Sequence, residues 1–327
     1  MDRVGFRTFL VERKTSEGAI AHAFAVAERF ESYVCETLGT PVGQASGDVA
    51  RSFSSELVKS DGDPYESCLA LLRFGRFVRN HDVTAAMLEM LDGHAALENL
   101  WRRVGDELGA PARDRVFAGV EIPPVEVSNV KKARRMQKAV ERLEAVVGSD
   151  RCGRLIGQGL HDIPDGALAG ERIAYEKAGG LDGYLRRKGD LFIAELKAVR
   201  DEGSLYFSQP ITDQVIAYVE AHPEIRQGVR VGDVLYEAKL PYMAAEYLRE
   251  TDPQLKAYYC CHCPWARESL RRGEKRVSKA FCNCSAALHK KLYEVIFGQE
   301  LEAEVVETVL AGDPWCKFAI RLPKGVA

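Results

Sequence analysis

The stretch that decides the fold runs from residue 281 to residue 323 and reads FCNCSAALHKKLYEVIFGQELEAEVVETVLAGDPWCKFAIRLP. Apolar residues recur at helical spacing over 285–297, and Gly298 follows as a typical helix C-cap. Residues 301–310 alternate in part between polar and apolar, and residues 316–323 alternate on one face, with a Gly-Asp-Pro turn between the two runs. The block therefore predicts a helix followed by two antiparallel strands.

The residues before this block continue the mixture of helices and strands. Residues 204–208 fit a short strand, and residues 229–240 fit two short strands about a Gly-Asp turn. Residues 256–259 read as a short strand or extended run that leads into a group of cysteines. Helical patterns cover 167–202, 211–221 and 242–250.

The N-terminal part of the chain is predicted to be all-helical. Apolar residues share one helical face over 16–38 and again over 65–80, and similar patterns continue to about residue 115. The segment GVEIPPVEVS at 119–128 interrupts them, because a Pro-Pro pair disfavours a helix. We expect a helical domain over 1–118, an extended linker over 119–129 and a second domain over 130–327.

The composition is that of a globular protein with a hydrophobic core. The 327 residues are 46% hydrophobic and 28% charged, and the net charge is -3, so nothing indicates a nucleic-acid partner or an anionic membrane. No window approaches the roughly 18 apolar residues that a membrane span needs, and the first residues do not resemble a secretory signal. We expect a cytoplasmic protein with mostly reduced cysteines.

Five of the nine cysteines fall within 25 residues, and a sixth follows them. They form two Cys-x-Cys pairs, Cys261 with Cys263 and Cys282 with Cys284, which stand 18 residues apart, and Cys260 and Cys316 lie outside the pairs. Residues two apart in an extended segment point to the same side, so one pair can face one ion. Thiolates are soft ligands that suit zinc, copper(I) or an iron–sulfur cluster.

The same cysteines also suit thiol chemistry. Cys284 just precedes the predicted helix at 285–297, and a helix N-terminus stabilises an anion and lowers a thiol pKa. Some cysteines of the group can equally be buried small hydrophobes, and His262 and His289 can be ordinary surface or core histidines. The residues by themselves leave metal ligation, reactive thiols and plain burial open.

The block at 281–323 resembles the end of the L-2-amino-thiazoline-4-carboxylic acid hydrolase-like family, which is similar in turn to the V4R (4-vinyl reductase) domain. The shared features are a cysteine before a short apolar helix that ends in glycine, a strand with acidic residues, and a closing Gly-Asp-x-x-Cys-x-Phe-x-Ile, here from Gly312 to Ile320. CCHCP at 260–264 and CGR at 152–154 also look like features of the hydrolase-like members. The resemblance covers about 250–325, is weak over 130–250 and is absent over 1–120.

The resemblance implies an α/β (α+β) fold for the second domain, with a small antiparallel sheet, packed helices and a ligand pocket. V4R domains of phenol-sensing regulators bind zinc near this cysteine-rich end. The matching positions are Cys282 or Cys284, an acidic residue among Glu302, Glu304 and Glu307, and Cys316. The V4R motif has another cysteine before its last one, and Thr308 stands near that place here. We therefore predict the metal ligands to be Cys261, Cys263, Cys282, Cys284 and Cys316.

Three hypotheses of function follow from this reading. The first is a metal- or thiol-dependent enzyme of the hydrolase type that cleaves a C–N or C–S bond in a small heterocycle, with Cys282 or Cys284 as nucleophile or zinc ligand and His289 moving protons. The second is a non-catalytic protein that binds or senses a small molecule, has a structural zinc and suits a homodimer. The third is an iron–sulfur protein. The sequence lacks the nucleotide-binding Gly-rich motifs and the Gly-x-Ser-x-Gly elbow, and GRLIGQG at 153–159 reads as a loop.

Overall fold

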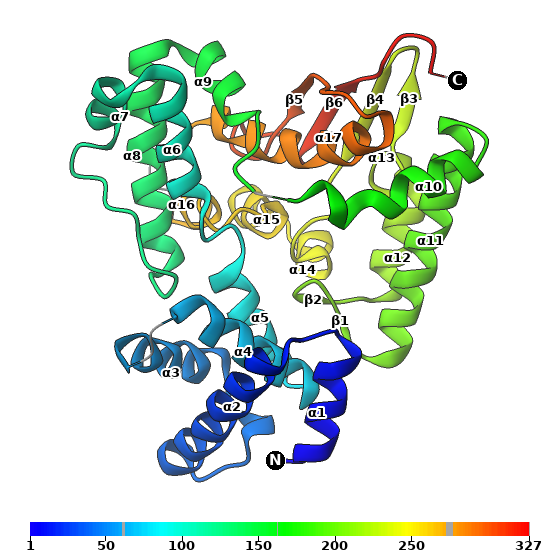
Figure 1. Ribbon diagram of the computed structural model, residues 1–327. Coiled ribbons are helices and arrows are strands. Elements are labelled where there is room, and N and C mark those ends of the chain that lie inside the picture. The colour runs from blue at the N-terminus through cyan, green and yellow to red at the C-terminus, as the bar shows by residue number, and fades with distance from the viewer. Residues whose placement is uncertain (61–62, 162, 273–276, 327) are drawn as a thin grey trace. The chain divides into compact units, whose positions relative to one another are not determined.

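The computed structural model describes residues 1–60, 63–161, 163–272 and 277–326, and Figure 1 shows their course. The described chain is mostly helical and has small antiparallel sheets, as the sequence predicts in outline. It divides into two compact units. The first comprises Met1–His94, Pro123–Ser128 and Gly203–Pro210, and the second comprises Ala95–Ile122, Asn129–Glu202 and Ile211–Ala327.

The division into compact units has different limits from the predicted domains. Residues 95–118 belong to the second unit, although the sequence groups them with the N-terminal helices. Residues 123–128, in the predicted linker, belong to the first unit, as does the segment Gly203–Pro210. Periodicity predicts helices, but it does not say which neighbouring helices share a core.

The first unit is helical, as predicted, with one two-stranded hairpin. Its core is built from aromatic side chains, among them Phe6, Phe30 and Phe74, which are fully buried. Its elements are α1 (Arg3–Glu12), α2 (Glu17–Leu38), η1 (Val42–Gln44), α3 (Gly47–Ser60), α4 (Pro64–Phe77), α5 (His81–Leu91), β1 (Leu205–Tyr206) and β2 (Gln209–Pro210).

The second unit combines a four-stranded antiparallel sheet with helices. The strands are β3 (Val229–Val231), β4 (Val234–Ala238), β5 (Ala303–Glu307) and β6 (Lys317–Arg321). The helices up to the sheet are α6 (Ala96–Leu108), α7 (Ala110–Phe117), α8 (Asn129–Val147), α9 (Ser149–Ile156), η2 (Asp165–Leu168), α10 (Ala169–Lys177), α11 (Leu181–Glu202), α12 (Asp213–Ala221) and α13 (Pro223–Arg226). The later helices are α14 (Ala244–Arg249), α15 (Pro253–Cys260), α16 (Arg267–Arg271), η3 (Lys279–Cys282) and α17 (Asn283–Phe297).

The strand order is β3-β4-β6-β5, so the two strands predicted at the C-terminus pair as expected and β4 completes the centre of the sheet. Glu237 pairs with Phe318 and Leu235 with Ile320, so these four side chains lie on one face. Helix α17 covers that face, as Figure 1 shows. Gly298 ends α17 with φ +67°, a left-handed conformation that favours glycine, which confirms the predicted C-cap.

Two segments next to the cysteines are helical where the sequence reading expected extended chain. Residues 256–259 lie in α15, which Asp252 caps by accepting a hydrogen bond from the Leu255 N–H. Cys282 ends η3 and Cys284 lies in the first turn of α17. Residues two apart in a helix lie about 200° apart around its axis, so the side chains of this pair diverge.

Candidate functional site

Helix α17 has two faces with different roles. Cys284, Leu288 and Lys291 follow one another at intervals of four and three residues and line a cleft. On another face, His289 and Tyr293 bond to Glu237 of the sheet. The helix therefore separates Cys284 from His289, although the sequence reading assigned both to one catalytic site.

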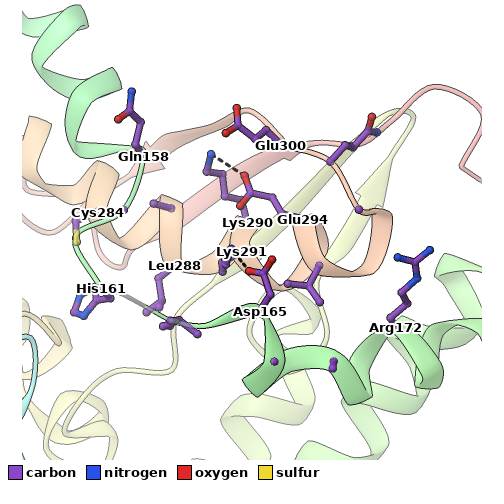
Figure 2. A pocket seen from close by; sticks show the side chains of 18 of the residues that line it. Gln158, His161, Asp165, Arg172, Cys284, Leu288, Lys290, Lys291, Glu294 and Glu300 are labelled. Carbon is purple, nitrogen blue, oxygen red and sulfur yellow. Dashed lines mark ion pairs between the residues drawn. The ribbon is translucent and has the colours of Figure 1, made fainter. Parts of the chain in front are cut away.

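The cleft has a volume of about 810 Å³ and lies within the second unit. The residues that line it come mainly from α17 and from the segment between α9 and α10, and Arg103 of α6 is a further one. Figure 2 shows the side chains along α17 and along the segment that faces it. Both charge signs are present, and two ion pairs join them: Lys290 with Glu294, and Lys291 with Asp165. A concave site with a few apolar groups and several polar ones suits a small polar organic molecule.

Cys284 and His161 are drawn at the same end of the cleft in Figure 2. Cys284 is buried, with 6% of its surface exposed, and its exposure is toward this cleft. Among the described residues that line the cleft, Cys284 is the one cysteine and His161 is the one histidine. His161 is not among the residues predicted from the sequence. The run GRLIGQG at 153–159 was predicted to be a loop, but its first four residues lie in α9, and only 157–159 belong to the loop that leads to His161.

Four other cysteines gather on the sheet side of α17. Cys260 at the end of α15 shares a hydrogen bond with Cys316 at the start of β6, and Cys261 and Cys282 are close enough to interact with Cys316 electrostatically. The Cys282 Sγ lies 2.9 Å from the Thr308 Oγ1, and the Thr308 side chain also bonds to Cys316. Thr308 stands near the position at which the V4R motif has a further cysteine. Its side chain therefore lies among the cysteine side chains of this group.

The cysteines of this group differ in their protonation. The hydrogen bond with Cys260 lowers the pKa of Cys316 to about 6, against the opposing effect of burial. Burial raises the pKa of Cys261 to about 12 and also raises that of Cys282. The hydrogen-bonded pair of Cys260 and Cys316 therefore ionises more readily than Cys261 or Cys282.

The predicted metal site does not fit this arrangement. Thiolates suit zinc or an iron–sulfur cluster in type. Across the parts of the chain that the structure describes, however, no three side chains of His, Cys, Asp or Glu are placed to hold one ion. Of the five predicted ligands, the structure brings Cys261, Cys282 and Cys316 together with Cys260, while Cys284 lines the cleft and Cys263 is half-buried beside the core. The zinc and iron–sulfur predictions stay predictions, and no chemical step below depends on a metal.

A buried carboxylate bonds to the middle of α17 and to the turn that follows. Glu237 accepts hydrogen bonds from the His289 Nδ1–H at 2.8 Å and the Tyr293 hydroxyl at 2.6 Å, and it pairs with Lys188 of α11. Burial by itself would raise the pKa of Glu237, but Lys188 and His289 outweigh burial and lower it to about 2. The carboxylate is therefore ionised over the whole physiological range. Its contacts make His289 part of the packing between α17 and the sheet.

Another histidine gives a prediction for the pH dependence of stability. Burial lowers the pKa of His262 from 6.5 to about 3, and its Nε2–H donates to the Leu240 carbonyl at 2.6 Å. The unfolded chain binds a proton below pH 6.5, whereas the folded chain stays neutral there until about pH 3. The contribution of His262 to stability is therefore complete above pH 6.5 and falls toward pH 3, by up to about 1.4 kcal/mol per pH unit.

Urea unfolding at a series of pH values checks this prediction. The variant His262→Asn keeps a donor for Leu240 but has no titrating ring, so its free energy of unfolding should fall less steeply over the same window. Equal slopes for the variant and the wild type would contradict the assignment to His262.

Comparisons with known proteins found no relative of this chain. No family model, curated protein or solved structure matches the chain. Across the described residues, none of the helices combines the length and the apolar composition that crossing a bilayer requires. The function must therefore be argued from the site itself.

Proposed function

We propose that this protein is a thiol-dependent enzyme of the hydrolase type that acts on a small organic molecule in the cleft along α17. The observation that carries the proposal is the position of Cys284. It lies in the first turn of a 15-residue helix and lines a cleft large enough for a small ligand. A thiol that lines such a cleft has access to a bound substrate, which a nucleophile requires.

Cys284 suits the role of nucleophile better than Cys282, its partner in the sequence motif. The Cys282 sulfur bonds to Thr308 on the sheet side of the helix. Cys284 alone of the two lies along the cleft.

The polar contacts beneath α17 serve to fix the position of Cys284. Lys239 donates to the Ser285 Oγ at 3.1 Å, next to Cys284 in the chain. Further along the helix, Glu237 holds both His289 and Tyr293. A helix held at its first turn and again at its middle keeps its nucleophile in one geometry, which contributes to catalysis by orientation.

The substrate class that we propose is a small heterocycle with a C–N or C–S bond to cleave. Two arguments support it: the size and mixed polarity of the cleft, and the resemblance of residues 250–325 to a thiazoline-ring hydrolase family. Attack of a thiolate on the electrophilic ring carbon opens the ring through a covalent intermediate, which water then hydrolyses.

A panel of thiazolines, thiazolidines and small cyclic amides tests the proposal. Opening of a sulfur-containing ring liberates a thiol, which a colorimetric reagent detects after the protein has been removed, and opening of a cyclic amide is followed by chromatography. We expect at least one ring to be opened by the wild type and by Cys35→Ser, because Cys35 is exposed on α2 of the first unit.

Two results would overturn the proposal. One is that no compound of the panel is turned over while calorimetry shows that one binds saturably, which would support a non-catalytic binding protein. The other is that a compound is opened at the same rate by Cys284→Ser, which would place the chemistry elsewhere.

A further inference from the structure

The loop between α9 and α10 is anchored to α6. Asn99 is buried, and its Nδ2 donates to the Leu160 carbonyl at 3.0 Å. Arg103, one helical turn later, donates to the Gly159 carbonyl at 2.7 Å. These two side chains fix the backbone of the two residues that precede His161.

The same loop packs closely against the first turn of α17. A Cβ added at Gly157 would lie 3.7 Å from the Asn283 Cβ, and one added at Gly159 would lie 3.7 Å from the Ala287 Cβ. Gly159 also has φ +97°, a conformation that favours glycine. Because Asn283 and Ala287 flank Cys284 on the helix, the chain that leads into His161 runs beside this cysteine.

Two other histidines near α17 do not line the cleft. His289 donates to Glu237 on the sheet side of the helix, and His262 bonds to the Leu240 carbonyl. His161 lines the cleft together with Cys284. A thiol from α17 and an imidazole from an anchored loop therefore line the same cleft.

We propose that His161 is the general base and acid of the reaction at Cys284. This inference rests on the proposed function and extends it by one catalytic residue. His161 takes the proton of the Cys284 thiol, and the thiolate forms an S–C bond with the electrophilic carbon of the substrate. The C–N or C–S bond of the ring breaks, and the leaving nitrogen or sulfur receives that proton from the imidazolium.

Hydrolysis of the intermediate completes the cycle with the same residue. A water molecule loses a proton to His161 and attacks the carbon, and the S–C bond breaks. The Cys284 sulfur leaves as a thiolate and recovers the proton from His161, so that one water is consumed for each ring opened. General acid–base help of this kind contributes about 10²–10⁴-fold to a rate.

The test is the rate at which iodoacetamide alkylates Cys284, measured by peptide mass spectrometry from about pH 5 to about pH 9, the range in which imidazole and thiol titrate. In the wild type, an imidazolium–thiolate pair should keep Cys284 reactive well below the ordinary thiol pKa. In His161→Asn we expect the reaction near pH 7 to slow by about tenfold or more, and the pH profile to become that of an ordinary thiol.

The chain supplies its own controls for this measurement. The exposed Cys35 should react equally in both proteins, and the buried Cys68 and Cys152 should stay unmodified as long as the variant is folded. His222→Asn, a change outside the cleft, should leave the Cys284 profile as it is.

The outcomes separate the two proposals. An unchanged Cys284 profile in folded His161→Asn would overturn the role of His161 and leave the proposed function standing. A wild-type Cys284 that reacts no faster than Cys35 at any pH would overturn the activated thiol itself, and with it the proposed function.

Discussion

Replacement of Glu237 by alanine is expected to lower the free energy of unfolding by about 3–5 kcal/mol, the usual cost of removing one partner from a buried ion pair. Only 7% of the Glu237 side chain is exposed, and its two oxygens accept hydrogen bonds from Lys188, His289 and Tyr293. Without the carboxylate, the buried Tyr293 hydroxyl loses its acceptor and the Lys188 ammonium loses its counter-charge. The missing acceptor and the missing counter-charge both weaken the contact between α17 and the sheet.

Urea unfolding at neutral pH measures this loss, and an exposed ion pair provides the matched control. Glu220 pairs with Lys197 at 3.0 Å, but nearly half of each side chain is exposed. Glu220→Ala should therefore cost under about 1 kcal/mol. Equal losses in the two variants would show that Glu237 does not hold α17 to the sheet.

Replacement of Cys284 by serine is expected to reduce turnover by about 10³-fold or more while the protein stays folded. A serine hydroxyl is close to the thiol in size, but it stays protonated where a thiol ionises, so the variant keeps the packing and loses the nucleophile. Hydrolysis of p-nitrophenyl acetate, followed by the release of nitrophenolate, gives a rate without knowledge of the natural substrate.

The variant Cys282→Ser makes this experiment discriminating. The two cysteines are separated by one residue, yet Cys284 lines the cleft and Cys282 bonds to Thr308. A loss of turnover that follows Cys282 and spares Cys284 would contradict the assignment of the nucleophile. Unfolding curves of both variants distinguish a loss of chemistry from a loss of fold.

The helix and the two strands at the C-terminus could be predicted because their signals are local. Apolar spacing and Gly298 mark α17, and alternation marks β5 and β6. The partner of β6 could not be predicted in this way, because β4 lies about eighty residues earlier and periodicity carries no information on long-range pairing.

The arrangement of the cysteines could not be predicted because it depends on the local conformation of their backbone. The two cysteines of a Cys-x-Cys pair face one ion only if the chain is extended. Here Ser278 caps the turn that leads through η3 into α17, so the second pair is helical. The motif Asp252-Pro253 was a readable signal for the start of α15, since Asp is a common N-cap and Pro is favoured in the first turn. That signal would have placed Cys260 at the end of a helix.

His161 illustrates the limit of sequence reasoning for this site. It follows a glycine-rich loop without periodicity, and the contact that fixes this loop comes from Asn99, which is 61 residues away from its partner Leu160. A single histidine in a loop carries no signal of its own chemistry. Only the folded chain brings it to the same cleft as Cys284.

Trapping of the covalent intermediate shows whether the Cys284 sulfur forms it. The protein is mixed with p-nitrophenyl acetate, quenched in acid during the first turnover and digested, and the acetylated peptide is located by mass spectrometry. We predict an acetyl group on Cys284 in the wild type and none at that position in Cys284→Ser. Acetylation of Cys282 or Cys316 in place of Cys284, or turnover with Cys284 unmodified at every time of quenching, would contradict this prediction.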